Sequence, residues 1–116
     1  FSTNSISIEK GIRTLLYKAL NPEIYRDGSK LPKFFVVCPP KMNVDGLNNE
    51  RTQANFGQIG FEILNNSKPY LEKGCSGLGV DVIDTSVVAG NIDGIHMDEK
   101  GHKLVADALI SIIKEL

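Results

Sequence analysis

Apolar and polar residues follow a helical period near the start of the chain. Over residues 7–20 the apolar side chains return every three or four positions, which predicts an amphipathic helix. Ser7 is placed to cap this helix, and Asn21-Pro22 is expected to end it, because proline disfavours helical geometry in the residue before it. The predicted apolar face consists of Ile8, Ile12, Leu15, Leu16, Ala19 and Leu20.

Two more segments have a helical pattern. The first covers residues 50–74, where Pro69 is expected to divide or kink the helix and Ser67 to cap its second part. The second follows Asp98, which can serve as its N-cap. The apolar stripe of this last helix consists of Leu104, Val105, Ala108, Leu109, Ile112, Ile113 and Leu116.

Two short runs of residues are typical of buried strands. Residues 33–38 form an apolar, β-rich run that ends at Pro39-Pro40, and its continuous hydrophobicity favours a strand buried on both faces of a parallel sheet. Residues 80–84 form the second run. The glycines expected to separate it from the preceding helix are Gly74, Gly77 and Gly79.

The order helix, strand, helix, strand, helix predicts an α/β fold with two parallel strands joined by a right-handed helical crossover. Two strands make a very small sheet, so we expect the remaining strands to come from elsewhere in the protein. The sequence opens at Phe1, and we interpret residues 1–116 as the C-terminal part of a single doubly wound domain. A partner subunit is the alternative source of the missing strands.

Composition and charge exclude several classes of function. Lys and Arg number 13 against 14 Asp and Glu, for a net charge of -1, so the chain is not expected to bind nucleic acid by bulk attraction. The longest clean apolar run, residues 34–38, is far too short to span a bilayer. Two cysteines make neither a disulfide framework nor a zinc pattern.

Candidate chemistry lies in Asp93-Gly94-Ile95-His96, a segment between the second strand and the last helix. Loops beyond the carboxyl ends of parallel strands carry the working groups of α/β proteins. A carboxylate three residues before an imidazole, with glycine allowing a tight turn, can accept from one ring nitrogen and orient the other for acid–base chemistry. The alternative is a common Asp-Gly turn with His96 as an ordinary surface residue.

This segment, followed by Asp98, Gly101-His102 and an apolar terminal helix, resembles the last conserved block of the SGNH, or GDSL-type, hydrolases. The similarity is closest to their arylesterase and lysophospholipase-like acyl-hydrolase branch. Segments in matching order support it: Phe1 with residues 8–12, then residues 34–40 and 80–84. The resemblance implies a three-layer α/β/α, flavodoxin-like SGNH hydrolase fold, of which this chain contributes two parallel strands and flanking helices.

The resemblance further implies Asp93 as the orienting acid and His96 as the general base of a catalytic triad. The family's serine nucleophile and its oxyanion-hole blocks have no counterpart in this sequence, so we expect the N-terminal half of the same domain to supply them. The isolated chain is expected to be inactive. The implied substrate is a small acyl ester, with no metal or organic cofactor; carbohydrate O-deacetylation and a non-catalytic binding module are the alternatives.

Other residues with possible chemical roles have simpler interpretations. Cys38, at the end of a predicted strand, could act as a nucleophile, but a small buried thiol explains it more simply. Glu99 and His102 have a spacing used in di-metal sites, and one such pair is too few to hold a metal. The resemblance implies that the loop of residues 41–49 helps to wall an acyl pocket; the alternative is an ordinary surface loop with apolar residues tucked under it. Its apolar residues are Met42, Val44 and Leu47.

Overall fold

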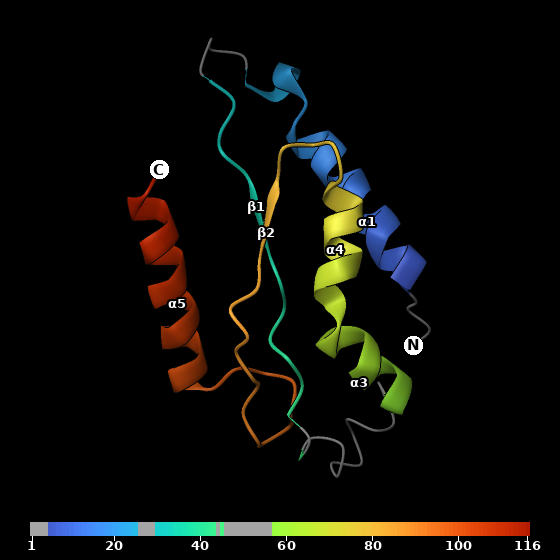
Figure 1. Cartoon of the computed structure of the whole chain (residues 1–116), viewed down its shortest axis with the longest axis vertical. Coiled ribbons are helices and arrows are strands. Elements are labelled where there is room, and N and C mark those ends of the chain that lie inside the picture. The colour runs from blue at the N-terminus through green and yellow to red at the C-terminus, as the bar shows by residue number, and fades with distance from the viewer. Residues whose placement is uncertain (1–4, 26–29, 44, 46–56) are drawn as a thin grey trace. The chain divides into compact units, whose positions relative to one another are not determined.

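The computed structural model describes residues 5–25, 30–43, 45 and 57–116. Over these residues the chain is mixed α/β, with four α-helices, a short 3-10 helix and a two-stranded parallel sheet (Figure 1). The predicted order of helices and strands is confirmed, and the helical region between the strands is divided in two.

The chain divides into two compact units. One takes its residues from Ser2–Cys38 and Ser67–Ile83, and the other from Pro39–Asn66 and Asp84–Leu116. The first contains the sheet and its neighbouring helices, and the second contains the loop with Asp93 and His96.

Helix α1 spans Ser5–Ala19, so it begins before the predicted start and Ser7 lies inside it rather than capping it. Serine occurs inside helices as well as at their N-caps, so the presence of Ser7 alone was not enough to predict where α1 begins. The predicted stop at Asn21-Pro22 is confirmed. Asn21 has an extended backbone (φ -67°, ψ 116°) and caps the 3-10 helix η1, Pro22–Ile24, by accepting from the Glu23 N–H.

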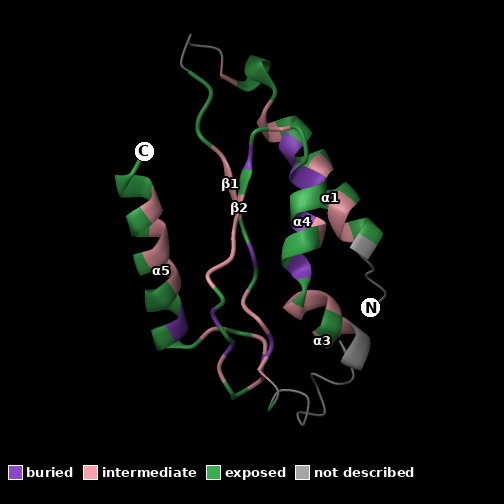
Figure 2. Cartoon of the chain, viewed as in Figure 1, coloured by how far each residue is buried: buried purple, intermediate pink, exposed green. Residues whose placement is uncertain are grey.

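The two strands are shorter than predicted. Strand β1 spans Phe35–Val37 and β2 spans Asp81–Ile83, paired in parallel with Phe35 opposite Asp81 and Val37 opposite Ile83. The expectation that the first strand is buried on both faces is wrong for this structure, because Phe35 and Val36 are only half-buried and Val37 is 38% exposed. No residue of β1 is buried (Figure 2). No third strand lies beside β1 or β2 among the residues that the structure describes, so no further strand covers Val37 there.

Helix α3 spans Gly57–Asn65 and α4 spans Ser67–Cys75, so the helical region is divided as predicted, although residues 50–56 of the prediction lie outside the described residues. The break falls at Asn66 rather than at Pro69. Pro69 lies in the first turn of α4, where a backbone N–H has no partner within the helix, and proline is therefore accommodated there without a kink. Ser67 is the first residue of α4 and not its cap.

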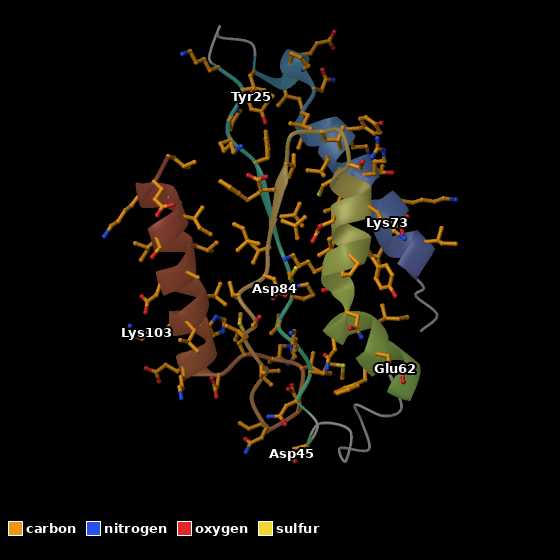
Figure 3. The ribbon with its side chains drawn as sticks, in the orientation of Figure 1. Tyr25, Asp45, Glu62, Lys73, Asp84 and Lys103 are labelled. Carbon is orange, nitrogen blue, oxygen red and sulfur yellow. The ribbon has the colours of Figure 1, made fainter. Side chains whose placement is uncertain are left out.

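The core of the first unit lies where α1 packs on α4 and α4 packs on β2. Leu16, Cys75 and Val80 are its buried centre. Polar contacts add to this packing: Arg13 of α1 donates to the carbonyl of Gly74 in α4 (3.2 Å) and to that of Ser76, just after the end of α4 (3.0 Å). Lys73, labelled in Figure 3, pairs with Glu9 at 3.9 Å.

Gly74 does not end the helix as predicted but lies inside α4, in its last turn. It is buried against α1, and a Cβ at this position would overlap Ile12 Cγ2 and lie 2.9 Å from the backbone oxygen of Glu9. Glycine is therefore required by the close approach of the helices. The chain turns after α4 at Gly77 and Gly79, whose φ angles of +77° and +69° favour glycine.

In the second unit, helix α5 spans Glu99–Lys114. The predicted cap is confirmed, since Asp98 Oδ1 accepts from the Gly101 N–H at 2.8 Å. The apolar stripe of α5 is only partly covered, and Leu104 and Ile113 are exposed. Among the described residues, no helix combines the length and apolar character needed to cross a membrane.

Candidate active site

The loop with Asp93 and His96 is anchored to a neighbouring segment of its own unit. Lys41 pairs with Val88 in a parallel bridge. The Lys41 N–H donates to the Val87 carbonyl and its own carbonyl accepts from the Ala89 N–H, both at 2.8 Å. The predicted loop of residues 41–49 therefore begins with strand-like pairing, which holds residues 87–89 in place just before the candidate site.

Backbone hydrogen bonds then close the loop on itself. The Gly90 N–H donates to the carbonyl of His96 at 2.9 Å, and the Gly94 N–H donates to the carbonyl of Gly90 at 3.1 Å. Gly94 is buried and has a φ of +74°, a left-handed conformation that favours glycine. The tight turn expected from Asp-Gly is thus present.

Asp93 uses both of its carboxylate oxygens within this turn. Oδ1 accepts from the backbone N–H of Ile95 at 2.9 Å and from that of His96 at 3.0 Å. Oδ2 lies 2.5 Å from His96 Nδ1. The structure therefore brings together the two side chains that the sequence singled out, and one carboxylate both folds the turn and holds the ring.

The charge of Asp93 determines which ring nitrogen carries the proton. Hydrogen bonds from the backbone N–H of His96, from its ring and from the N–H of Ile95 hold the pKa of Asp93 well below its usual range. An ionised carboxylate can only accept, so Nδ1 is the donor of this pair. In the neutral imidazole, Nε2 is then the nitrogen that can take up a proton.

The imidazole is accessible. The side chain of His96 is 83% exposed, whereas that of Asp93 is 35% exposed. An oriented ring that is open to solvent can meet a reactant, and the carboxylate behind it can stabilise the imidazolium that forms. The catalytic roles of Asp93 and His96 remain predictions.

The other sequence candidates are placed as follows. Cys38 directly follows β1, is buried, and donates its backbone N–H to the Ile83 carbonyl at 2.8 Å, which fits a small core residue. His102 is an exposed residue of α5. Over the described part of the chain, no cluster of three or more His, Cys, Asp or Glu residues could hold a metal ion. Met42 is buried, while Val44 and Leu47 lie outside the described residues.

Asn43 is a feature of the site that the sequence did not reveal. Its backbone N–H donates to the Gly94 carbonyl at 3.1 Å, and its side-chain Nδ2 donates to the Ala89 carbonyl at 3.2 Å. Its Oδ1 accepts from the backbone N–H of Asp45 at 3.0 Å. Asparagine is common in turns, so nothing in the local sequence distinguishes Asn43 from an ordinary loop residue.

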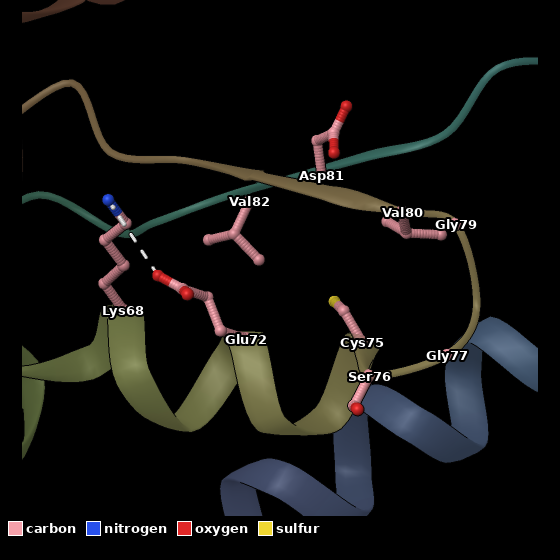
Figure 4. A pocket seen from close by; sticks show the side chains of 9 residues that line it. All are labelled: Lys68, Glu72, Cys75, Ser76, Gly77, Gly79, Val80, Asp81 and Val82. Carbon is pink, nitrogen blue, oxygen red and sulfur yellow. Dashed lines mark ion pairs between the residues drawn. The ribbon is translucent and has the colours of Figure 1, made fainter.

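The first unit contains a pocket between α4, β2 and the turn that joins them (Figure 4). The Cys75 sulfur faces into it, and the ion pair of Lys68 with Glu72 (3.9 Å) lies along its wall. Burial raises the pKa of the Cys75 thiol, and the nearby Arg13 offsets only part of that effect. The thiol therefore stays protonated at neutral pH and is a poor nucleophile.

Comparison of the chain with models of known protein families, with curated proteins and with solved structures found no match. The functional interpretation therefore rests on the geometry of Asp93 and His96, on the α/β architecture and on the sequence motifs described above.

Proposed function

We propose that this chain supplies the acid–base half of a serine-dependent acyl ester hydrolase of the SGNH, or GDSL, type. The observation that carries the proposal is the contact of His96 Nδ1 with Asp93 Oδ2, at 2.5 Å, beside an exposed ring. Asp93 acts as the orienting acid and His96 as the general base. Parallel strands connected through helices agree with the three-layer, flavodoxin-like fold of that family.

The proposed reaction begins when a serine hydroxyl attacks the carbonyl carbon of a small acyl ester. His96 Nε2 removes the hydroxyl proton and then delivers it to the leaving alcohol, so that an acyl-enzyme forms. His96 next removes a proton from water, which attacks the acyl-enzyme, and the proton returns to the serine oxygen as the acid is released. The Asp93 carboxylate stabilises the imidazolium in both stages. Neither stage requires a metal or an organic cofactor.

We propose that the serine and the oxyanion-hole donors come from an N-terminal half of the same domain, of which residues 1–116 are the C-terminal part. The small sheet supports this arrangement, because β1 and β2 have three residues each and Val37 is 38% exposed. Further strands beside β1 would cover such a residue and enlarge the sheet to a more stable size.

The proposal is tested in the full-length protein with a fluorophosphonate probe and with turnover of short p-nitrophenyl esters. Wild-type protein should be labelled at serine. His96→Ala should lower kcat by several orders of magnitude, and loss of the Asp93 carboxylate should cost up to about 10⁴-fold. His102→Ala is the matched control, since it removes the chain's other histidine, an exposed residue of α5.

Near-normal turnover in His96→Ala would contradict the catalytic assignment. Absence of both labelling and turnover in folded wild-type protein would favour a non-catalytic α/β binding module. An acetylated saccharide included in the substrate panel separates carbohydrate O-deacetylation from simple ester hydrolysis.

A further inference from the structure

Asn43 contacts the Asp93–His96 loop at two points that are distant from its own position in the sequence. Its backbone N–H holds the carbonyl of Gly94, and its side-chain amide holds the carbonyl of Ala89. Ala89 lies immediately before the closed part of the loop, and Gly94 lies at its left-handed turn. One residue therefore fixes both the entrance of the loop and its tightest point.

Asn43 is itself held in place by the residue before it. The preceding residue, Met42, is 3% exposed, and its backbone N–H donates to Asn65 Oδ1 at 2.8 Å, at the end of α3. Ala89 is equally buried, at 3%. The two segments that Asn43 connects are thus packed in the interior of their unit, so a change at Asn43 is transmitted to the exposed loop rather than absorbed by a loose neighbour.

We propose that Asn43 is a positioning residue for the acid–base pair, acting through its hydrogen bonds to Gly94 and Ala89. For its kinetic consequence this inference rests on the proposed function. The Asp93 carboxylate can hold the ring only while Gly94 keeps its left-handed turn, because Oδ1 spans that turn to the N–H groups of Ile95 and His96. The Asn43 N–H binds the carbonyl of the same glycine.

The asparagine side chain suits this task in a way that its nearest analogues do not. Nδ2 donates to the Ala89 carbonyl while Oδ1 accepts from the N–H of Asp45. Aspartate would keep the acceptor but would place a carboxylate oxygen against the Ala89 carbonyl, which is repulsive. Serine would keep an oxygen that can accept from the Asp45 N–H, but its side chain is too short to donate to the Ala89 carbonyl as the amide does. Unlike aspartate, it would add no charge.

The test compares Asn43→Asp and Asn43→Ser with the matched control Asn66→Asp. The control removes a side-chain amide bond in the same unit that is exposed and local, from Asn66 Nδ2 to the Glu62 carbonyl at 2.8 Å, and that involves no residue of the Asp93–His96 loop. The first measurement is the NMR signal of the His96 Nδ1 proton in the full-length protein, assigned by its loss in His96→Gln. The second is kcat and KM for a short acyl ester.

Both Asn43 variants should weaken or broaden the Nδ1 proton signal and speed hydrogen exchange of the Ile95 and His96 amides, with Asn43→Asp the more severe. Under the proposed function kcat should fall by up to about 100-fold, with KM little changed, because misplacement of the base slows the chemical step. Asn66→Asp should retain the wild-type signal and turnover. If Asn43→Asp fails to fold, Asn43→Ser provides the same comparison without an added charge.

An unchanged Nδ1 signal and unchanged amide exchange in a folded Asn43 variant would overturn the positioning role, even if the enzyme proves to be an esterase. A disturbed signal in a protein whose turnover survives His96→Ala would uphold the positioning role and contradict the proposed function. The two proposals therefore fail separately.

Discussion

Replacing Gly74 with alanine tests whether the close approach of α4 to α1 is required by the fold. The added Cβ would overlap Ile12 Cγ2 and lie 2.9 Å from the Glu9 backbone oxygen. The Ile12 side chain can rotate away, but the Glu9 carbonyl belongs to a helix and cannot move without shifting α1. Overpacking of this kind typically costs about 1–3 kcal/mol. Alanine recovers less than about 1 kcal/mol of helix propensity in a last turn.

We therefore expect Gly74→Ala to lower the free energy of unfolding by about 1–2 kcal/mol. Gly11→Ala is the matched control, because Gly11 is an exposed interior residue of α1 and a Cβ added there would meet nothing within 4 Å. The control should be stabilised by up to about 1 kcal/mol. Gly74→Ala and Gly11→Ala are thus expected to change the free energy of unfolding in opposite directions.

The assay is urea unfolding followed by circular dichroism, with the two variants measured beside the wild type. An additional variant, Ile12→Ala with Gly74→Ala, separates the two clashes, since it removes the side-chain overlap and leaves the backbone one. If Gly74→Ala proves as stable as Gly11→Ala, the helices are not packed as closely as the structure describes, and the reasoning is refuted.

Three further predictions concern single side chains. Asp98→Ala should lower the free energy of unfolding by about 1 kcal/mol through loss of the α5 cap, and Asp98→Asn should restore most of it; equal stability of the two variants in urea would contradict the capping role. The pKa of Asp93 is lowered, so its carboxylate should stay ionised well below about pH 3.9; its contribution to stability is present above that pH and is lost as the pH falls through the lowered pKa. A carboxyl NMR titration measures this directly, and an ordinary midpoint would mean that the turn is not formed. Burial raises the pKa of Cys75, so its alkylation by iodoacetamide in the native protein should be much slower than after unfolding; equal rates would show that the thiol is not buried.

The features predicted correctly from the sequence are those determined by neighbouring residues. The Asp98 cap depends on the N–H of Gly101, three residues ahead, and the stop after α1 depends on Pro22. The approach of Asp93 to His96 is equally local, since the two residues are three positions apart and the carboxylate can contact the ring within one turn of the chain. Local chemistry of this kind is visible in a sequence.

The features that were missed depend on contacts between distant segments. Gly74 was expected to end a helix, but it lies inside one. The reason is its packing on Ile12 and Glu9, which are more than sixty positions away in the sequence and so could not be recognised from the residues around Gly74. The strands are shorter than their apolar runs, since pairing extends only as far as a partner strand accompanies them. Asn43 belongs to the same class, because its two acceptors lie some fifty residues further along the chain.

The two carboxylate oxygens of Asp93 have different partners. One accepts from the backbone amides of the turn, and the other accepts from the imidazole. Substitution by asparagine would replace one acceptor with an NH₂ group, which would face either the amide donors of the turn or Nδ1 of the ring. In the second case Nδ1 would have to accept, so the proton of the neutral ring would lie on Nε2. Folding of the turn and orientation of the ring thus depend on the same side chain. Loss of the carboxylate would remove both together.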